Sequence, residues 1–156
     1  MKENCKIDKK QHITDAEWEV MRVVWAKQMT SSSEIIAILS RTYCWSASTI
    51  KTLITRLSEK GYLTSQRQGR KYIYSSLISE EEALEQQVSE VFSRICVTKH
   101  QALIRHLIEE TPMTLSDIEK LEALLLSKKA NAVPEVKCNC IVGQCSCHEH
   151  LEVTSK

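Results

Sequence analysis

Hydrophobic residues recur at helical spacing three times in the first half of the chain, and a polar start signal precedes each repeat. We expect the first helix to start at the capping box Thr14–Glu17 and to end near Gln28. The second is expected to start at Ser31–Ser33, supported by Glu34, and to end near Arg41. The buried face of the first helix is predicted to consist of Trp18, Met21, Val24 and Trp25.

The third repeat is followed by two β-prone runs. Its helix is expected to start after Ser46, a suitable N-cap residue, and to stop before Gly61, because glycine tolerates the left-handed conformation past a helix end. Its buried face is predicted to consist of Ile50, Leu53, Ile54 and Leu57. The runs Tyr62–Arg67 and Arg70–Tyr74 flank a glycine turn and predict a β-hairpin. Three helices and a basic hairpin predict a winged helix-turn-helix domain in residues 1–76.

Residues 77–129 carry three further helical patterns, two of them opened by the capping boxes Ser79-x-x-Glu and Ser116-x-x-Glu. The first of these helices is expected to reach about Cys96. Three short helices with so many aliphatic positions would leave an apolar surface exposed in a monomer, so this segment is predicted to form a homodimer. Packing of these helices onto the winged helix of the same chain is the alternative.

The composition agrees with a mainly α protein. The 156 residues are 42% hydrophobic and include only 3 Gly and 2 Pro, which favours a packed core of helices joined by short turns. No stretch approaches the ~20 apolar residues of a membrane helix, and the polar start lacks the apolar core of a secretory signal. We therefore expect a cytoplasmic protein with no membrane partner.

The net charge of +1 conceals two unlike halves. Residues 1–75 hold 13 Lys and Arg against 7 Asp and Glu, a net charge of +6, whereas residues 76–156 hold 8 against 13, a net charge of −5. A basic half suits a polyanion, so contact with nucleic acid is expected at the N-terminal half. A chance imbalance of charge is the alternative.

The face of the third helix opposite its apolar side carries hydroxyl and basic side chains. Lys and Arg can contact guanine edges or phosphates, and Thr can donate or accept a hydrogen bond while its methyl group packs on thymine. A solvated helix face explains any one of them alone, but residues 45–75 hold six basic residues and one acidic residue. We predict contact with double-stranded DNA by Ser46, Ser48, Thr49, Lys51, Thr52, Thr55 and Arg56 on the helix, and by Arg67, Arg70 and Lys71 at the hairpin tip.

The C-terminal segment 130–156 is predicted to be a linker followed by a metal-binding tail. The tail has the spacing Cys-x-Cys-x4-Cys-x-Cys, formed by Cys138, Cys140, Cys145 and Cys147. Four thiolates suit Zn(II) in a tetrahedron or Cu(I) at low coordination, and the paired spacing favours Cu(I). A redox disulfide pair is the alternative, which a reducing cytosol disfavours.

The remaining cysteines are isolated in the sequence, and packing or no role is the default for Cys5, Cys44 and Cys96. His148 and His150 lie next to the motif and are interpreted as part of a polar tail, with assistance to the metal site as the alternative. His12, His100 and His106 are assigned no role.

The segments Ile13–Met21, Trp45–Leu57 and Lys60–Leu63 resemble the BlaI/MecI/CopY family of winged-helix repressors. The resemblance covers residues 10–128, and the cysteine tail resembles that of the copper-responsive, CopY-type members. Thr49, Lys51, Thr52 and Arg56 match the recognition helix of the family, and the four tail cysteines match its metal motif. Ala47 and Ser48 stand where relatives often have Pro-Lys, which removes one positive charge near the helix start.

This resemblance implies a homodimer on a palindromic operator upstream of copper-transport genes. A zinc-loaded form is implied to hold DNA, and a Cu(I)-loaded form to release it, with a copper chaperone as a candidate supplier. Two alternatives are a repressor switched by proteolysis whose tail holds only zinc, and a thiol protein that buffers metal. An enzyme is disfavoured because no nucleophile, base and orienting group occur together in the sequence.

Overall fold

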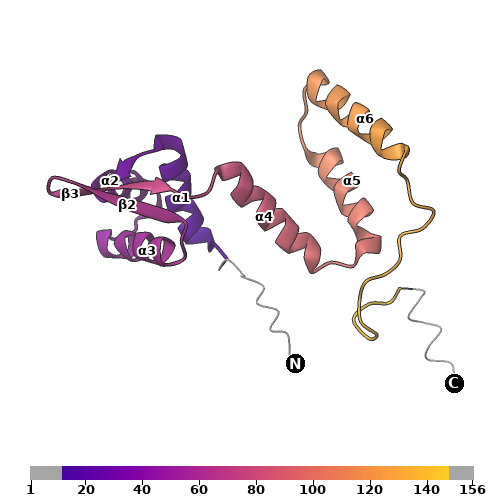
Figure 1. Cartoon of the computed structure of the whole chain (residues 1–156), viewed down its shortest axis with the longest axis horizontal. Coiled ribbons are helices and arrows are strands. Elements are labelled where there is room, and N and C mark those ends of the chain that lie inside the picture. The colour runs from indigo at the N-terminus through magenta and orange to yellow at the C-terminus, as the bar shows by residue number, and fades with distance from the viewer. Residues whose placement is uncertain (1–11, 148–156) are drawn as a thin grey trace, which may run out of the picture. The chain divides into compact units, whose positions relative to one another are not determined.

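The computed structural model describes residues 12–147, and the chain divides into two compact units, Met1–Glu85 and Gln86–Lys156. The predicted N-terminal arm with Cys5, and the tail residues His148 and His150, lie outside the described residues. The described part is mainly helical with one small antiparallel sheet, which confirms the predicted fold class (Figure 1).

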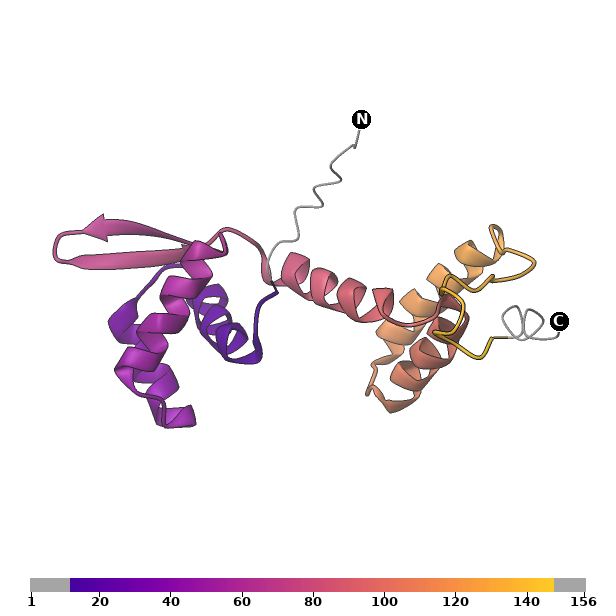
Figure 2. The same cartoon turned by 90° about the horizontal axis from the view of Figure 1, so that it is seen from below.

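The N-terminal unit contains the three predicted helices and the predicted hairpin. Its order is α1 (Asp15–Lys27), β1 (Thr30–Ser31), α2 (Ser32–Tyr43), α3 (Ala47–Glu59), β2 (Leu63–Gln68) and β3 (Lys71–Ser76). The strands form an antiparallel sheet in the order β1-β3-β2. The hairpin of β2 and β3 projects beyond the helices as a two-stranded ribbon (Figures 1 and 2). These elements form the predicted winged helix.

The strand β1 is an element that the sequence did not predict. It has two residues, Thr30 and Ser31, which pair with Tyr74 and Ile73 of β3. Two residues are too few to show the alternation of a strand, and Ser31 also serves as the N-cap of α2. The start of α2 is therefore fixed to the base of the hairpin.

The predicted caps form as expected in this unit. The Thr14 amide donates to Glu17 Oε2 at 2.8 Å, and the Ser31 amide donates to Glu34 Oε2 at 2.8 Å. Gly61 has φ +77°, a left-handed conformation that favours glycine, and it follows α3 as predicted.

The core of the unit lies between the three helices and the sheet. Its fully buried side chains include Met21 and Val24 of α1, Ile35 of α2, and Ile50 and Leu57 of α3. Trp18 and Trp25 are only half-buried and meet edge to face with ring centroids 5.0 Å apart. The Trp25 indole donates to the carbonyl of Ile78 at 2.9 Å, which ties α1 to the chain that leaves β3.

A buried ion pair joins the start of α1 to the end of α3. The Glu17 side chain is 1% exposed, and its Oε2 atom accepts hydrogen bonds from Lys60 Nζ at 2.6 Å and from the Thr14 amide at 2.8 Å. Lys60 Nζ also donates to the carbonyl of His12 at 2.8 Å. Burial alone would raise the pKa of Glu17, but the hydrogen bonds from Lys60 and Thr14 outweigh it and lower the pKa below its usual value.

The C-terminal unit contains most of α4 (Glu80–Ser93), a short 3-10 helix η1 (Val97–Lys99), α5 (His100–Glu110) and α6 (Leu115–Lys129). The predicted cap at Ser79 forms, because the Ser79 amide donates to Glu82 Oε2 at 2.9 Å. Helix α4 ends at Ser93, three residues before Cys96, the approximate end that the sequence predicted. His100 Nε2 lies 3.0 Å from the carbonyl oxygens of both Phe92 and Ile95, so its N–H satisfies acceptors at that helix end.

The predicted start of the last helix at Ser116 is wrong. Thr114 is the N-cap, and its hydroxyl accepts from the Asp117 amide at 3.2 Å while the Thr114 amide donates to Asp117 Oδ2 at 3.1 Å. Two overlapping capping-box patterns occur here, Thr114-x-x-Asp117 and Ser116-x-x-Glu119. The structure uses the first of them, so the helix begins at Leu115.

Helices α5 and α6 contain no buried residue. Apolar side chains along α4, α5 and α6 are instead exposed, as the predicted apolar surface requires. They are Leu84, Val88, Val91, Ile104, Leu107, Ile108, Leu115, Ile118, Leu124, Leu125 and Leu126.

The substitution Lys60→Met is expected to destabilise the protein by about 3 kcal/mol at pH 7, because it leaves the buried Glu17 carboxylate without its cation. A carboxyl whose pKa is lowered in the fold stabilises it above the ordinary pKa, and this contribution is lost as pH falls through the lowered value. The difference between wild type and variant should therefore shrink below pH 4.5, the ordinary value.

Urea unfolding followed by circular dichroism at several pH values measures both effects. Lys51→Met, at an exposed position of α3, is the matched control and should change stability little. Equal stability of the Lys60→Met variant and the control at pH 7 would contradict a structural role for the pair.

Candidate DNA-binding surface and cysteine cluster

Helix α3 presents a polar face to solvent and an apolar face to the core. Ile50, Leu53, Ile54 and Leu57 are buried, as predicted. The seven residues of the helix region that were predicted to contact DNA are all exposed, namely Ser46, Ser48, Thr49, Lys51, Thr52, Thr55 and Arg56. The core therefore fixes the orientation of this polar face.

The hydroxyl groups on this face are partly committed to the helix itself. Thr52 Oγ1 donates to the carbonyl of Ser48 at 3.0 Å, and Thr55 Oγ1 donates to the carbonyl of Lys51 at 3.0 Å. Each hydroxyl hydrogen is then occupied, while the oxygen lone pairs and the methyl group still face outward. These two threonines are therefore suited to accept a hydrogen bond or to pack on a methyl group.

A small cluster of hydroxyls lies at the start of α3. Ser46 Oγ accepts from the Thr49 amide at 3.1 Å and lies 2.9 Å from Ser48 Oγ and 2.8 Å from Thr49 Oγ1. Ser46 is thus the N-cap of α3, and it orients the first turn of the helix.

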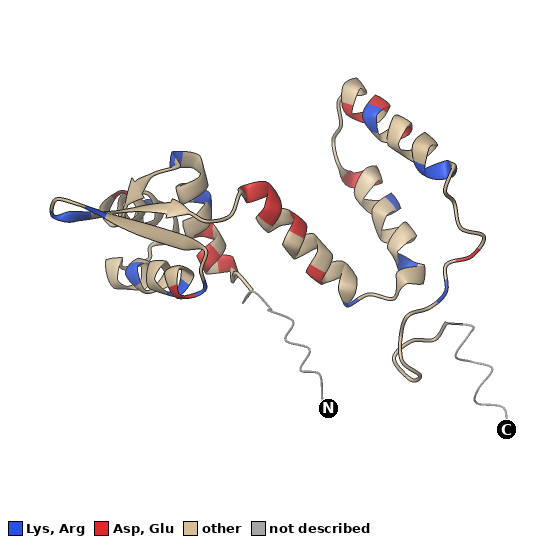
Figure 3. Cartoon of the chain, viewed as in Figure 1, with Lys and Arg blue, Asp and Glu red and all other residues tan. Residues whose placement is uncertain are grey.

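The three predicted cations of the hairpin are exposed but differ in position. Arg67 Nε donates to the carbonyl of Gly69 at 3.1 Å, which holds its side chain over the turn between β2 and β3. Figure 3 shows basic residues at the hairpin tip. Arg67 and Arg70 therefore form a cationic end to the ribbon.

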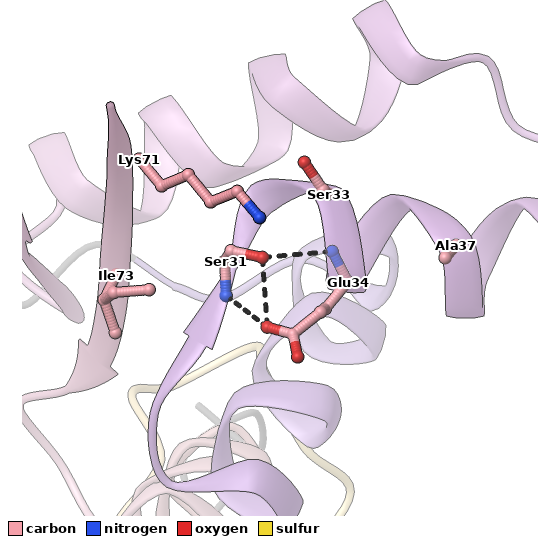
Figure 4. Close-up of a pocket in the computed structure, with 6 residues that line it drawn as sticks. All are labelled: Ser31, Ser33, Glu34, Ala37, Lys71 and Ile73. Carbon is pink, nitrogen blue, oxygen red and sulfur yellow. Dashed lines mark hydrogen bonds between the residues drawn. The ribbon is translucent and has the colours of Figure 1, made fainter. Parts of the chain in front are cut away.

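Lys71 belongs to a different feature, a pocket between β3 and the start of α2. The pocket is lined by Ser31, Ser33, Glu34, Ala37, Lys71 and Ile73. Figure 4 shows the Lys71 side chain reaching from β3 toward the first turn of α2, where Ser31 and Glu34 form the capping box. Lys71 thus places a positive charge beside a helix N-terminus, and both attract anions.

The cysteines gather in the C-terminal unit. The Sγ atoms of Cys96, Cys138, Cys140 and Cys145 all lie within 4.8 Å of one another. Cys138 Sγ is 3.3 Å from Cys145 Sγ and 3.4 Å from Cys96 Sγ. The structure thus brings three of the four predicted tail cysteines together, and adds Cys96.

The fourth predicted ligand, Cys147, lies beside this group. Its Sγ atom is 3.5 Å from Cys96 Sγ and 3.4 Å from Thr98 Oγ1. A turn at Gly143, with φ +91° and a hydrogen bond from the Gln144 amide to the Ile141 carbonyl at 3.1 Å, returns the second Cys-x-Cys pair toward the first. This is the loop closure that the spacing predicted.

No pattern in the sequence indicated that Cys96 joins the cluster. Cys96 is 42 residues before Cys138 in the chain, and no ligand spacing connects the two. Packing alone was the expected role of this residue, and it is 6% exposed as a packed residue would be. Cys44 is exposed and lies outside the group.

The thiols of the cluster differ in acidity. Hydrogen bonds from Thr98, with smaller contributions from Cys138 and Cys147, lower the pKa of Cys96 to about 6. The backbone amide of Cys147 is the main cause that lowers the pKa of Cys145 to about 7. A hydrogen bond from the Cys140 amide favours the Cys138 thiolate, but burial and the neighbouring thiols outweigh it and raise the pKa of Cys138. Two of the thiols are therefore readily ionised, and the thiolate is the form that binds metal.

The geometry of the group fits a metal ion. Zn(II) bound to four thiolates at about 2.3 Å places the sulfurs about 3.8 Å apart. The observed separations of 3.3 and 3.4 Å, and the limit of 4.8 Å for the set, bracket this value. The four cysteines can therefore hold one ion, although sulfur ligands alone do not distinguish Zn(II) from Cu(I).

Among residues 12–147, no helix is long and apolar enough to cross a membrane.

Several known proteins are similar to this chain over most of its length, and regulatory proteins and repressors are among them. Residues 13–127 match the penicillinase repressor family. A 16.5 kDa protein encoded beside ptsI in Latilactobacillus sakei is 38% identical over 137 residues, 88% of this chain and 94% of that protein. The methicillin resistance regulatory protein MecI of Staphylococcus aureus (strain N315) is 30% identical over 121 residues, 78% of this chain and 98% of MecI.

A solved structure contains BlaI of Bacillus licheniformis, in monomeric form, in complex with the blaP half-operator. BlaI in that complex is 40% identical to this chain, with 47% of this chain and 90% of BlaI covered and a TM-score of 0.43. The family consists of transcriptional repressors and not of enzymes, which agrees with the expectation from the sequence. The family match covers 13–127, well over half of the chain, so this protein belongs to the penicillinase repressor family of DNA-binding transcriptional repressors.

Proposed function

We propose that this repressor controls a copper-homeostasis operon in the cytoplasm, holding its operator when its cysteines bind Zn(II) and releasing it when they bind Cu(I). The observation that carries the proposal is a compact group of thiols in a chain whose family binds DNA. Four soft ligands of one kind select thiophilic ions, so the metal itself is the natural signal.

Helix α3 is the element that reads the operator in this proposal. Lys51 and Arg56 contact guanine edges or phosphates in the major groove, and Thr52 and Thr55 accept hydrogen bonds from base amino groups or pack on thymine methyls. Ser46, Ser48 and Thr49 place the start of the helix against the phosphate backbone.

The hairpin and Lys71 supply contacts of lower sequence specificity. Arg67 and Arg70 follow the phosphates or enter the minor groove beside the helix. Lys71 and the N-terminus of α2 provide a second phosphate contact.

A second copy of the chain completes the binding unit. The exposed apolar residues of α4, α5 and α6 form a self-complementary surface, as a two-fold homodimer requires. Two recognition helices about 34 Å apart then fit successive major grooves of a palindromic site.

The cysteines convert metal identity into a change of conformation. Zn(II) supplies a four-coordinate link between distant parts of the C-terminal unit, whereas Cu(I) prefers fewer sulfurs and releases some of the thiols. Freed thiols no longer hold the tail in place, and the population shifts away from the dimer that fits the operator. A copper chaperone is the proposed source of Cu(I).

The replacement of Arg56 by Ala is expected to weaken operator binding by about 1–3 kcal/mol, because it removes a base or phosphate contact. Fluorescence anisotropy with an operator selected from random duplex DNA measures the loss. Lys129→Ala, at an exposed position of α6, is the control of equal charge change and should bind normally. Equal affinity of the two variants would exclude Arg56 from the interface.

The double substitution Leu107→Asp with Leu124→Asp is expected to convert the dimer to a monomer, because both residues are exposed in α5 and α6 and would carry buried charge in a dimer. Sedimentation velocity gives the mass, and circular dichroism checks that the helices persist. Met29→Asp, at an exposed apolar position of the N-terminal unit, should leave the mass unchanged. A monomeric wild type would refute the dimer.

Cu(I) added to the zinc-loaded protein under reducing conditions is expected to release operator DNA. The change of all four tail cysteines to Ser should make the operator affinity independent of Cu(I). Gel-shift titration measures both. Repression that ignores copper but is lost after proteolysis would favour the proteolytic switch. Absence of salt-dependent DNA affinity would instead favour a metal buffer.

A further inference from the structure

Cys96, the thiol of the cluster that the spacing along the chain does not predict, is also the one that lies between two helical elements. Cys96 follows α4 and serves as the residue before the first turn of η1. Its Sγ atom lies 3.4 Å from Cys138 Sγ, so the tail folds back over 42 residues to reach it. On the basis of the metal-binding role proposed above, we propose that Cys96 is a metal ligand with Cys138, Cys140 and Cys145, and that the metal fastens the tail to the end of α4.

A contact that involves no thiol holds the tail at the same place. The Val97 amide donates to Asn139 Oδ1 at 3.1 Å, and Asn139 lies between the first two cysteines of the tail. Val97, the residue that follows Cys96, is therefore hydrogen-bonded to Asn139, the residue that follows Cys138. The tail therefore contacts the chain next to Cys96 through the Asn139 side chain as well as through the sulfur atoms.

The backbone around Cys96 is itself fixed. The His100 ring bonds to the carbonyls of Phe92 and Ile95 and meets the Phe92 ring edge to face at 4.8 Å. The Lys99 amide donates to the Cys96 carbonyl at 2.9 Å. A ligand on such a braced turn is pre-organised, whereas the other thiols come from a tail that forms no helix or strand over residues 131–147.

Cys147 has a different position from the other tail cysteines. It is not among the four whose sulfur atoms all lie within 4.8 Å of one another, although its thiol interacts with Thr98, Cys145, Cys96 and Cys138. A single four-coordinate ion is therefore complete without it. This reverses the assignment that the tail spacing alone suggests, in which Cys147 is a ligand and Cys96 is not.

The thiols are reachable by an incoming ion. An open cavity is lined by Arg94, Ile95, Lys99 and Gln144 together with Cys96, Cys140 and Cys145. Three of the four proposed ligands therefore border one cavity. The ion then bridges the tail to the junction of α4 and η1, next to helices that carry the exposed apolar residues.

Cobalt(II) substitution tests the ligand set in the full-length, reduced protein. Each thiolate bound to Co(II) adds sulfur-to-metal charge-transfer absorption, so the intensity per ion reports the number of thiolates. We expect Cys96→Ser to lose about a quarter of the intensity, as one of four ligands, and to bind Co(II) and Zn(II) about 100-fold more weakly. Cys147→Ser and the control Cys44→Ser should retain the wild-type intensity and affinity.

Wild-type intensity and affinity in Cys96→Ser would overturn the proposal, and a loss confined to Cys147→Ser would establish a site made of the tail alone. In that case the copper response of the repressor could still hold, because the four tail cysteines would suffice for it. Failure of the proposed function would differ, since Cu(I) would then leave operator binding unchanged even where Cys96 is a ligand.

A second measurement needs no substitution and so does not depend on the folding of a variant. Zn(II) should slow the alkylation of Cys96 in the wild-type chain by about tenfold, read by mass spectrometry, because a metal-bound thiolate is a poor nucleophile. Cys44 should react equally with and without zinc. An unchanged rate at Cys96 beside a protected Cys147 would overturn the proposal.

Discussion

The buried carboxylate of Glu17 makes the ion pair on which the placement of α3 depends. It completes the cap of α1, accepts a hydrogen bond from Lys60 directly after α3, and is 1% exposed. A charge in that position is costly unless every partner is present, so the start of α1 and the end of α3 must meet in one geometry. The hydrophobic core supplies most of the stabilisation, but it is less directional than this pair. Glu17, a buried residue, thereby fixes the orientation of the polar face of α3.

Much of the N-terminal unit was predictable because its signals are local. Capping boxes at Thr14 and Ser31 and the apolar repeat of α3 involve residues within a few positions of one another. The strand β1 escaped prediction because two residues show no period and because its partner, β3, lies some forty positions later. The misplaced start of α6 has a different cause, since two equivalent cap patterns overlap and only the packed chain selects Thr114.

The thiol group shows the limit of such reasoning most clearly. The spacing of the tail cysteines predicted that they lie close together, with a turn at Gly143 between the two pairs. Cys96 could be found only in three dimensions, because its neighbours are set by how the linker after α6 returns to the end of α4. The structure of the residues predicted to face DNA could be predicted only in part. The helical period placed them on one exposed face. It could not show that the hydroxyl groups of Thr52 and Thr55 donate hydrogen bonds to carbonyls of the helix backbone.

The three tryptophans of the chain all lie in the N-terminal unit, at Trp18, Trp25 and Trp45. The Trp45 ring stacks on that of Tyr43 immediately before α3, with centroids 4.8 Å apart, whereas the half-buried Trp18 and Trp25 meet against the edge of the core. Tryptophan fluorescence therefore originates only in the half of the molecule assigned to DNA, whereas a metal bound to the thiols adds charge-transfer absorbance from the other half. The chain thus carries separate optical signals for its two halves, and the docking of α3 and the loading of the cysteines can be timed in one sample without an attached dye.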